Sequence, residues 1–160
     1  MIQFDEHGYL FPHEIIEISL ADFERYFVAD LPDKERRNEI FETYSQYLSE
    51  LIEVVGKDFF QLVNGSFTTK KELPRDIDLT TFVDYRICRD CEDGIIQIGD
   101  KWENKRLIDC YIIPLSYQGH PRFIQSQLAY EYWRSLYSLS KPNEIGHACP
   151  KGLLKINFSK

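Results

Sequence analysis

The chain has 160 residues and a formal net charge of −7, which is enough length for one domain with a sizeable core. Its apolar content of 43% and aromatic content of 14% exclude a disordered chain. The acidic balance argues against a general electrostatic affinity for nucleic acid. No apolar run approaches a membrane span and no signal-peptide pattern opens the sequence, so we expect a cytoplasmic protein with reduced cysteines and no membrane contact.

The first third of the chain predicts an irregular N-terminal extension followed by a long helix. Residues 1–33 contain Gly8, Pro12 and scattered aromatics, with a short helix expected over 20–27. Apolar residues then recur at helical spacing, which predicts an amphipathic helix over 34–55 that ends at Gly56. We interpret this helix as a core-facing element without chemistry of its own.

The rest of the chain predicts strands and one more helix. Residues 59–63 and 77–83 are apolar runs of strand type, and 107–115 is a third that Pro114 ends. Residues 95–98 alternate weakly and predict an edge strand, 127–139 predict a helix, and 151–158 predict a last strand. This order predicts an α/β or α+β fold with a mixed sheet, in a single domain over 1–160 whose core spans 34–115, with 116–160 adding the last helix and strand.

A Gly-Ser turn follows the first predicted strand directly. Glycine lets the backbone approach a ligand, and the N–H groups of such a turn can hold a phosphate together with the hydroxyl of Ser66. Isolated cations after a turn are typical of a solvated surface, but these lie where a triphosphate needs positive charge. The predicted nucleotide-binding residues are therefore Gly65, Ser66, Lys70, Lys71 and Arg75.

Two carboxylates open the second strand at alternate positions, so Asp76 and Asp78 share one face. Carboxylates held together repel unless a cation lies between them, and magnesium is a hard cation that prefers oxygen ligands. Asp109 lies within the third strand, where a lone charge needs a partner, and it completes a site if that strand is central and adjoins 77–83. Asp84 lies on the same face of the strand as Asp76 and Asp78, but it is further along the strand and is therefore a weaker candidate than Asp109. The ordered set predicts that Asp76, Asp78 and Asp109 hold two Mg²⁺ ions, although Asp-x-Asp alone is typical of a turn before a strand.

In this order, Gly65-Ser66 and Asp76-Ile77-Asp78 resemble the signature of the nucleotidyltransferase superfamily related to DNA polymerase β, above all its minimal bacterial members. The segments 64–79, 8–12 and 151–156 are similar to a small uncharacterised bacterial group within that superfamily. The resemblance implies a mixed sheet with packed helices, two Mg²⁺ ions on Asp76, Asp78 and Asp109, and a phosphate-binding Ser66. It also implies transfer of NMP from an NTP to a hydroxyl. Residues 67–69 depart from the minimal members, which often carry an arginine there.

The same resemblance bears on partners. Several minimal members pair with a helical protein in toxin–antitoxin modules, where one member modifies the other or a tRNA. The chain is short for a separate acceptor-binding domain, so the expected acceptor is a docked protein or an RNA end. The alternative is a non-catalytic antitoxin or interaction module that keeps the fold and binds a partner protein.

Other residues suggest weaker alternatives. Cys88 and Cys91 form a C-x-x-C pair that could hold zinc with His147 and Cys149, but the spacing of the second pair is poor. Trp102 is expected in a charged loop, where it could stack on a base or meet a partner. The aromatic residues of the second long helix are better explained by core or partner packing than by base stacking.

Overall fold

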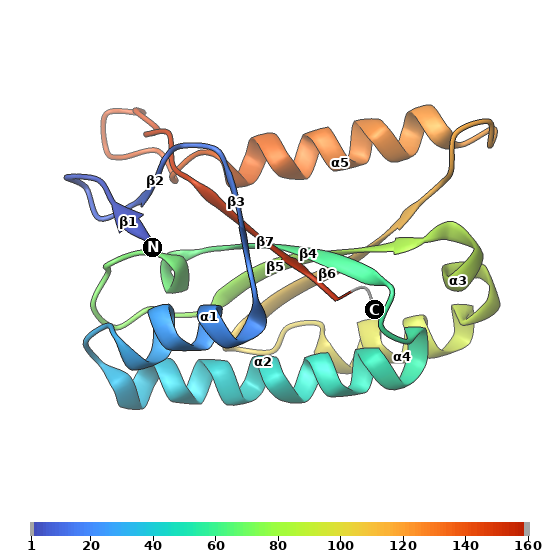
Figure 1. Ribbon diagram of the computed structural model, residues 1–160, viewed down its shortest axis with the longest axis horizontal. Coiled ribbons are helices and arrows are strands. Elements are labelled where there is room, and N and C mark those ends of the chain that lie inside the picture. The colour runs from blue at the N-terminus through green and yellow to red at the C-terminus, as the bar shows by residue number, and fades with distance from the viewer. Residues whose placement is uncertain (1, 159–160) are drawn as a thin grey trace.

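The computed structural model describes residues 2–158, in which a five-stranded mixed sheet lies between two helical layers (Figure 1). The strands are β1 (Gln3–Phe4), β2 (Leu10–Phe11), β3 (Ile15–Ile18), β4 (Phe59–Asn64), β5 (Ile77–Asp84), β6 (Ile108–Leu115) and β7 (Leu153–Asn157). The helices are α1 (Leu20–Glu24), α2 (Lys34–Val55), α3 (Tyr85–Asp90), α4 (Glu92–Trp102) and α5 (Phe123–Tyr137), with a π-helical turn η1 (Arg25–Ala29) and a 3-10 turn η2 (Ser66–Thr68). The predicted α+β class is confirmed.

The main sheet has the strand order β3-β7-β4-β5-β6. The inner pairs β7–β4 and β4–β5 are antiparallel, and the outer pairs β3–β7 and β5–β6 are parallel. Because β5 and β6 are parallel, the chain must return between them, and it does so through α3 and α4. The predicted last strand is β7, and it lies inside the sheet between β3 and β4. The N-terminal extension is not irregular as predicted, because it supplies the edge strand β3 and the short β1–β2 sheet.

Alternate residues of each strand pack on opposite faces of the sheet. One face carries Val63, Leu79 and Ile156 in the main core and packs against α1, α2 and α4 (Figure 1). The other face carries Leu62, Phe82 and Leu153 in a smaller cluster with α5 (Figure 1). Among residues 2–158, no helix combines the length and apolar character needed to cross a membrane.

The predicted helix over 34–55 is confirmed as α2 with the same bounds. Its buried residues follow the expected 3.6-residue spacing and include Ile40, Tyr44 and Leu51. Gly56 ends the helix with φ +77°, a backbone conformation that glycine adopts without steric cost.

The predicted edge strand over 95–98 is wrong, because this segment lies within α4. Ile98 and Trp102 are buried four residues apart on one side of that helix, facing the main core. A Cβ on Gly94 would lie 2.8 Å from Val54 Cγ1, so the glycine lets α4 approach α2 closely. Trp102 is therefore not the predicted loop aromatic: its Nε1 donates to Glu50 at 2.9 Å.

The strand that carries Asp109 lies at the edge of the sheet and not at its centre. An edge strand accepts a proline because one of its sides needs no hydrogen-bond donor, and Pro114 accordingly lies inside β6 opposite Val83. Asp109 is exposed, so the expectation of a buried lone charge is also wrong. The predicted contact between β6 and β5 is nevertheless present.

Candidate functional site

Three neighbouring strands place polar side chains in one row at the end of the sheet. Asn64 on β4 lies opposite Asp78 on β5, and Asp78 lies beside Asp109 on β6. Residues in register on adjacent strands project from the same face, so all three lie on the face that α5 covers. Asp76 comes just before β5 and is half-buried. The structure thus brings the strands of the predicted aspartates together.

The charges of the three aspartates act on one another. Burial, together with the negative charges of Asp76 and Asp109, raises the pKa of Asp78 to about 6. Lys141 and Lys151 oppose this rise. The carboxylate of Asp78 is therefore held in a region with too little positive charge, which a bound cation would correct.

The fit of this site to magnesium is partial. Within residues 2–158, no group of three or more His, Cys, Asp and Glu side chains is arranged to enclose a metal ion. The oxygen donors are of the right type, and magnesium commonly takes only one or two carboxylates and completes its shell with water and phosphates. The row is therefore an open set of ligands that a metal–phosphate complex could complete.

Gly65 shapes the position of Asp78. Its φ is +90°, and a Cβ built there would lie 2.6 Å from Asp78 Oδ2. The carboxylate of Asp78 thus occupies the space that a side chain at 65 would take. Gly65 was predicted to let a phosphate approach the backbone, and its steric relation to Asp78 is a second role that the sequence did not indicate.

Ser66 closes the loop between β4 and β5. Its Oγ accepts a hydrogen bond from the backbone N–H of Arg75 at 3.2 Å, and its carbonyl accepts one from the Thr69 hydroxyl at 2.8 Å. Ser66 is only half-buried, so its hydroxyl hydrogen remains available to a ligand. The loop and the serine therefore hold each other in place beside the aspartates.

A buried arginine of α2, Arg37, holds the same loop between β4 and β5 through hydrogen bonds to its backbone. The guanidinium of Arg37 donates to four backbone carbonyls at 2.8–3.0 Å, and the side chain is fully buried. These carbonyls belong to Phe27, Phe67, Thr69 and Lys71. Helix α2 was interpreted as a core-facing element without chemistry of its own, and through Arg37 it also anchors the loop of the candidate site. The signal in the sequence was an arginine on the apolar side of the helix, three residues before Ile40.

The predicted cations of the loop are exposed and lie in its outer part. Lys70 Nζ lies 5.4 Å from the ring centre of Phe4, and the backbone N–H of Lys70 donates to Gly8. Lys71 and Arg75 are exposed as well. None of the three is among the cations that act on the pKa of Asp78.

Lys151 is a buried cation at the aspartate end of the sheet, and it is not among the residues predicted to form the site. It lies just before β7, with an exposed fraction of 7%. Burial lowers its pKa to about 8, while the charge of Asp78 acts in the opposite direction. The available signal was a lone lysine beside Gly152 at the start of an apolar strand.

The other constellations do not assemble. Cys88 and Cys91 lie in and just after α3, which follows the far end of β5, and burial raises the pKa of Cys88 to about 11. Cys149 instead lines a hollow with residues of the β1–β2 segment. Asp84 is paired with Arg86 at 2.7 Å, so it does not join the other aspartates. Core packing is confirmed for Tyr130, which meets the rings of Phe60 and Phe82 edge-on, and for the buried Tyr137, whereas Tyr132 of the same helix is exposed.

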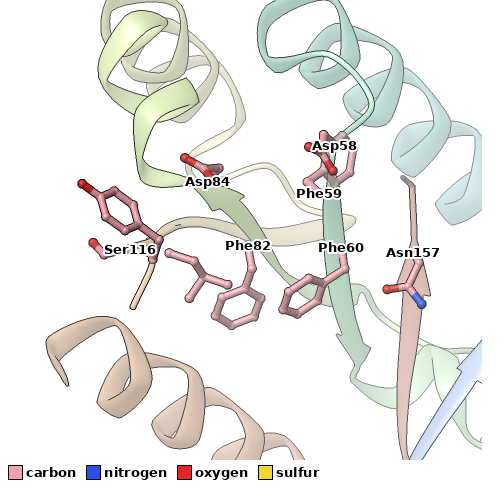
Figure 2. A pocket seen from close by; sticks show the side chains of 9 residues that line it. Asp58, Phe59, Phe60, Phe82, Asp84, Ser116 and Asn157 are labelled. Carbon is pink, nitrogen blue, oxygen red and sulfur yellow. The ribbon is translucent and has the colours of Figure 1, made fainter. Parts of the chain in front are cut away.

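A hollow of about 350 Å³ lies at the opposite end of the same sheet face. Figure 2 shows Phe60 and Phe82 side by side within it, with Asp58 and Asp84 at its rim. The two rings are stacked with centres 5.0 Å apart. Since Asp84 lies six residues beyond Asp78 on β5, roughly 20 Å of strand separates this hollow from the aspartate row.

Comparison with known proteins gives one relationship. A model of a family of unknown function, DUF6932, matches residues 2–157. No curated protein and no solved structure matches the chain. Because the family model spans nearly all of the sequence, the chain belongs to the DUF6932 family.

Proposed function

We propose that the protein is a magnesium-dependent nucleotidyltransferase that transfers NMP from an NTP to a hydroxyl group. The observation that carries the proposal is the register of Asp78 and Asp109 on adjacent strands, with Asp76 close by and the Gly65-Ser66 turn beside them. A carboxylate with a raised pKa in such surroundings is typical of a functional site.

Each part of the site has a task in this proposal. Asp76, Asp78 and Asp109 would hold Mg²⁺, which supplies neutralisation of the phosphate charge when bound. The hydroxyl of Ser66 and the adjoining backbone N–H groups bind a phosphate. Lys151 contributes a buried positive charge to the inner phosphates, and the outer phosphates remain the predicted contacts of Lys70, Lys71 and Arg75.

The reaction forms one bond and breaks one. The acceptor oxygen attacks the α-phosphorus, the bond from that phosphorus to the β-bridging oxygen breaks, and pyrophosphate leaves. The acceptor proton passes to a carboxylate, and Asp109 suits this task because it is exposed on an edge strand. Most of the rate enhancement would come from positioning and charge neutralisation.

The open position of Asp109 also supports an acceptor that docks from outside. A net charge of −7 disfavours broad binding to RNA, so the proposed acceptor is a hydroxyl on a partner protein or at an RNA end such as that of tRNA. A toxin–antitoxin module with a helical partner is the proposed setting. Cytoplasmic placement fits the four free cysteines at positions 88, 91, 110 and 149.

The test is incubation with each labelled NTP, Mg²⁺ and candidate acceptors. Label transfer is expected with the unaltered protein and should be abolished in the double variant Asp76→Asn with Asp78→Asn. Asp84→Asn serves as the matched control, because Asp84 lies on the same strand face but is paired with Arg86. Transfer that survives the double variant would refute the proposed site.

A second candidate, a non-catalytic module that binds a helical partner protein, is favoured by one observation. The outer side of α5 exposes apolar residues at every fourth position, which form a continuous row: Ile124, Leu128, Tyr132 and Leu136. This candidate predicts complex formation that Leu128→Glu abolishes and Asp78→Asn leaves unchanged, with no transfer of label. Loss of transfer without loss of complex formation in Asp78→Asn would favour the enzyme instead.

A further inference from the structure

Asn64 is the one member of the polar row that the proposed chemistry does not yet use. It is the last residue of β4, directly before Gly65, and its exposed fraction is 7%. Within residues 2–158, its buried Oδ1 atom has no hydrogen-bond partner. A buried carbonyl oxygen without a partner is uncommon and calls for a physical reason.

Other buried polar side chains of the same sheet are satisfied. The amide of Gln61 bonds to the hydroxyls of Tyr44 and Thr81, and the Thr80 hydroxyl donates to that of Tyr137. The strand positions that flank Asn64 on its face are leucines, Leu62 on β4 and Leu153 on β7. Packing alone would therefore be served by an apolar residue at position 64 as well.

The position of Asn64 beside the aspartates gives a reason for its unpaired oxygen. It is the register partner of Asp78, which in turn is the partner of Asp109, so three oxygen-bearing side chains from three adjacent strands share one face. An amide oxygen is a regular ligand of hard divalent cations. Being neutral, it adds a ligand without adding to the repulsion among the aspartates.

We propose that Asn64 Oδ1 is an oxygen ligand of the divalent cation held at Asp78 and Asp109. The inference rests on the proposed function for the presence of that cation. It extends the proposed ligand set beyond carboxylates to the strand that precedes the Gly65-Ser66 turn. A metal ligand, Asn64, would then directly precede the phosphate-binding turn, Gly65-Ser66, in the chain.

The test measures binding of Mn²⁺ alone, by titration with detection of free Mn²⁺ in electron paramagnetic resonance and without nucleotide. Asn64→Leu is expected to weaken Mn²⁺ binding about tenfold or more, a loss of the size seen when supporting groups of metal sites are removed. In metal-free buffer, the midpoint of urea unfolding of this variant should stay level or rise, because a buried unpaired oxygen is gone. Asn157→Leu is the matched control on the same face at the far end of β7, and it should leave Mn²⁺ binding unchanged.

The outcomes separate this inference from the proposed function. Mn²⁺ binding that Asp78→Asn abolishes but Asn64→Leu leaves intact would overturn the role of Asn64 alone. An unaltered protein that binds no Mn²⁺ would also overturn the role of Asn64, whereas the proposed function is decided separately by the transfer of label from an NTP. If Asn64→Leu does not fold, Asn64→Ala removes the same oxygen without adding volume, and the same tenfold loss is expected of it.

Discussion

Gly65 and Asp78 fit together as a pair across β4 and β5. The Asp78 carboxylate occupies the space where a side chain at 65 would begin, with its Oδ2 atom 2.6 Å from that point. The backbone of Gly65, at φ +90°, also excludes most other residues. The observed position of the Asp78 carboxylate therefore requires a glycine at position 65.

Gly65→Ala is expected to displace the Asp78 carboxylate and to destabilise the protein. Gly56→Ala is its control, because Gly56 has a similar φ of +77° but no atom within 4 Å of the added Cβ. Both glycines combine a positive φ with ψ near ±180°, a backbone conformation that costs a residue with a side chain about 1–3 kcal/mol. Gly56→Ala should therefore lose about that much in urea unfolding, and Gly65→Ala clearly more. Equal losses in the two variants would show that the contact with Asp78 has no energetic weight.

The pKa of Asp78 predicts a pH-dependent effect of Asp78→Asn on stability in metal-free buffer. Because the pKa is raised to about 6 in the folded state, the folded protein holds a proton that the unfolded chain has lost between about pH 4 and 6. The charge of Asp78 therefore lowers the free energy of unfolding as pH rises through this window. At pH 7.5, Asp78→Asn should be more stable by about 1–3 kcal/mol, and the gain should vanish near pH 4.

Asp84→Asn is the control of opposite sign on the same strand. Hydrogen bonds from Arg86 lower the pKa of Asp84, so its charge stabilises the folded state above its unfolded pKa. Removing that charge should destabilise the protein at pH 7.5, and the loss should fade as the solution is acidified. Urea unfolding at several pH values checks both variants, and a gain in stability for both would contradict the assignment.

Arg37 is expected to be required for the loop that carries Ser66. Arg37→Met removes the donors to four carbonyls, and buried carbonyls without partners each cost about 1–3 kcal/mol. We expect a loss of about 3 kcal/mol or more in the free energy of unfolding. Arg37→Lys should recover only part of it, because an ammonium group lacks the forked geometry of guanidinium. Faster amide hydrogen exchange in residues 67–71 would locate the effect, and unchanged exchange there would contradict it.

Lys151 is expected to bind the polyphosphate of the substrate. Lys151→Met keeps a similar length without the charge and should weaken binding of a fluorescent NTP analogue with Mg²⁺ about tenfold or more. Binding of the corresponding NMP should change less, since it lacks the further phosphates. The double variant Lys70→Ala with Lys71→Ala tests the exposed cations in the same assay, and a larger loss there than in Lys151→Met would assign the main contact with the phosphates to Lys70 and Lys71.

Elements whose signals are local could be predicted well from the sequence. Helix α2 has both its apolar spacing and its terminal glycine within one segment, and its bounds agree with the prediction. The segment 95–98 failed because three isoleucines favour a strand, whereas packing against α2 selects a helix. Its helical spacing becomes visible only when Trp102 is counted with Ile95 and Ile98.

The candidate site could be predicted in outline but not in its supporting residues. The pairing of β5 with β6 follows from chain order and brings Asp78 beside Asp109 as expected. Lys151 and Arg37 owe their positions to contacts between segments far apart in the chain. The sequence marks Lys151 as a lone lysine before an apolar strand and Arg37 as an arginine on the apolar side of a helix. It does not indicate which distant residues each cation contacts, and only the structure shows them.

The place of β7 has a consequence for how the protein is made. This strand lies between β3 and β4, although it follows both of them, as well as β5 and β6, in the chain and therefore leaves the ribosome after them. Until it does, the nascent chain displays the open backbone edges of β3 and β4, and Lys151 has not yet reached the aspartates. Figure 1 shows β7 in its place within the sheet, and Lys151 lies just before this strand in the chain. The same late event thus completes the sheet and brings Lys151 to the acidic end, so a nascent chain lacks the complete site until its sheet is whole.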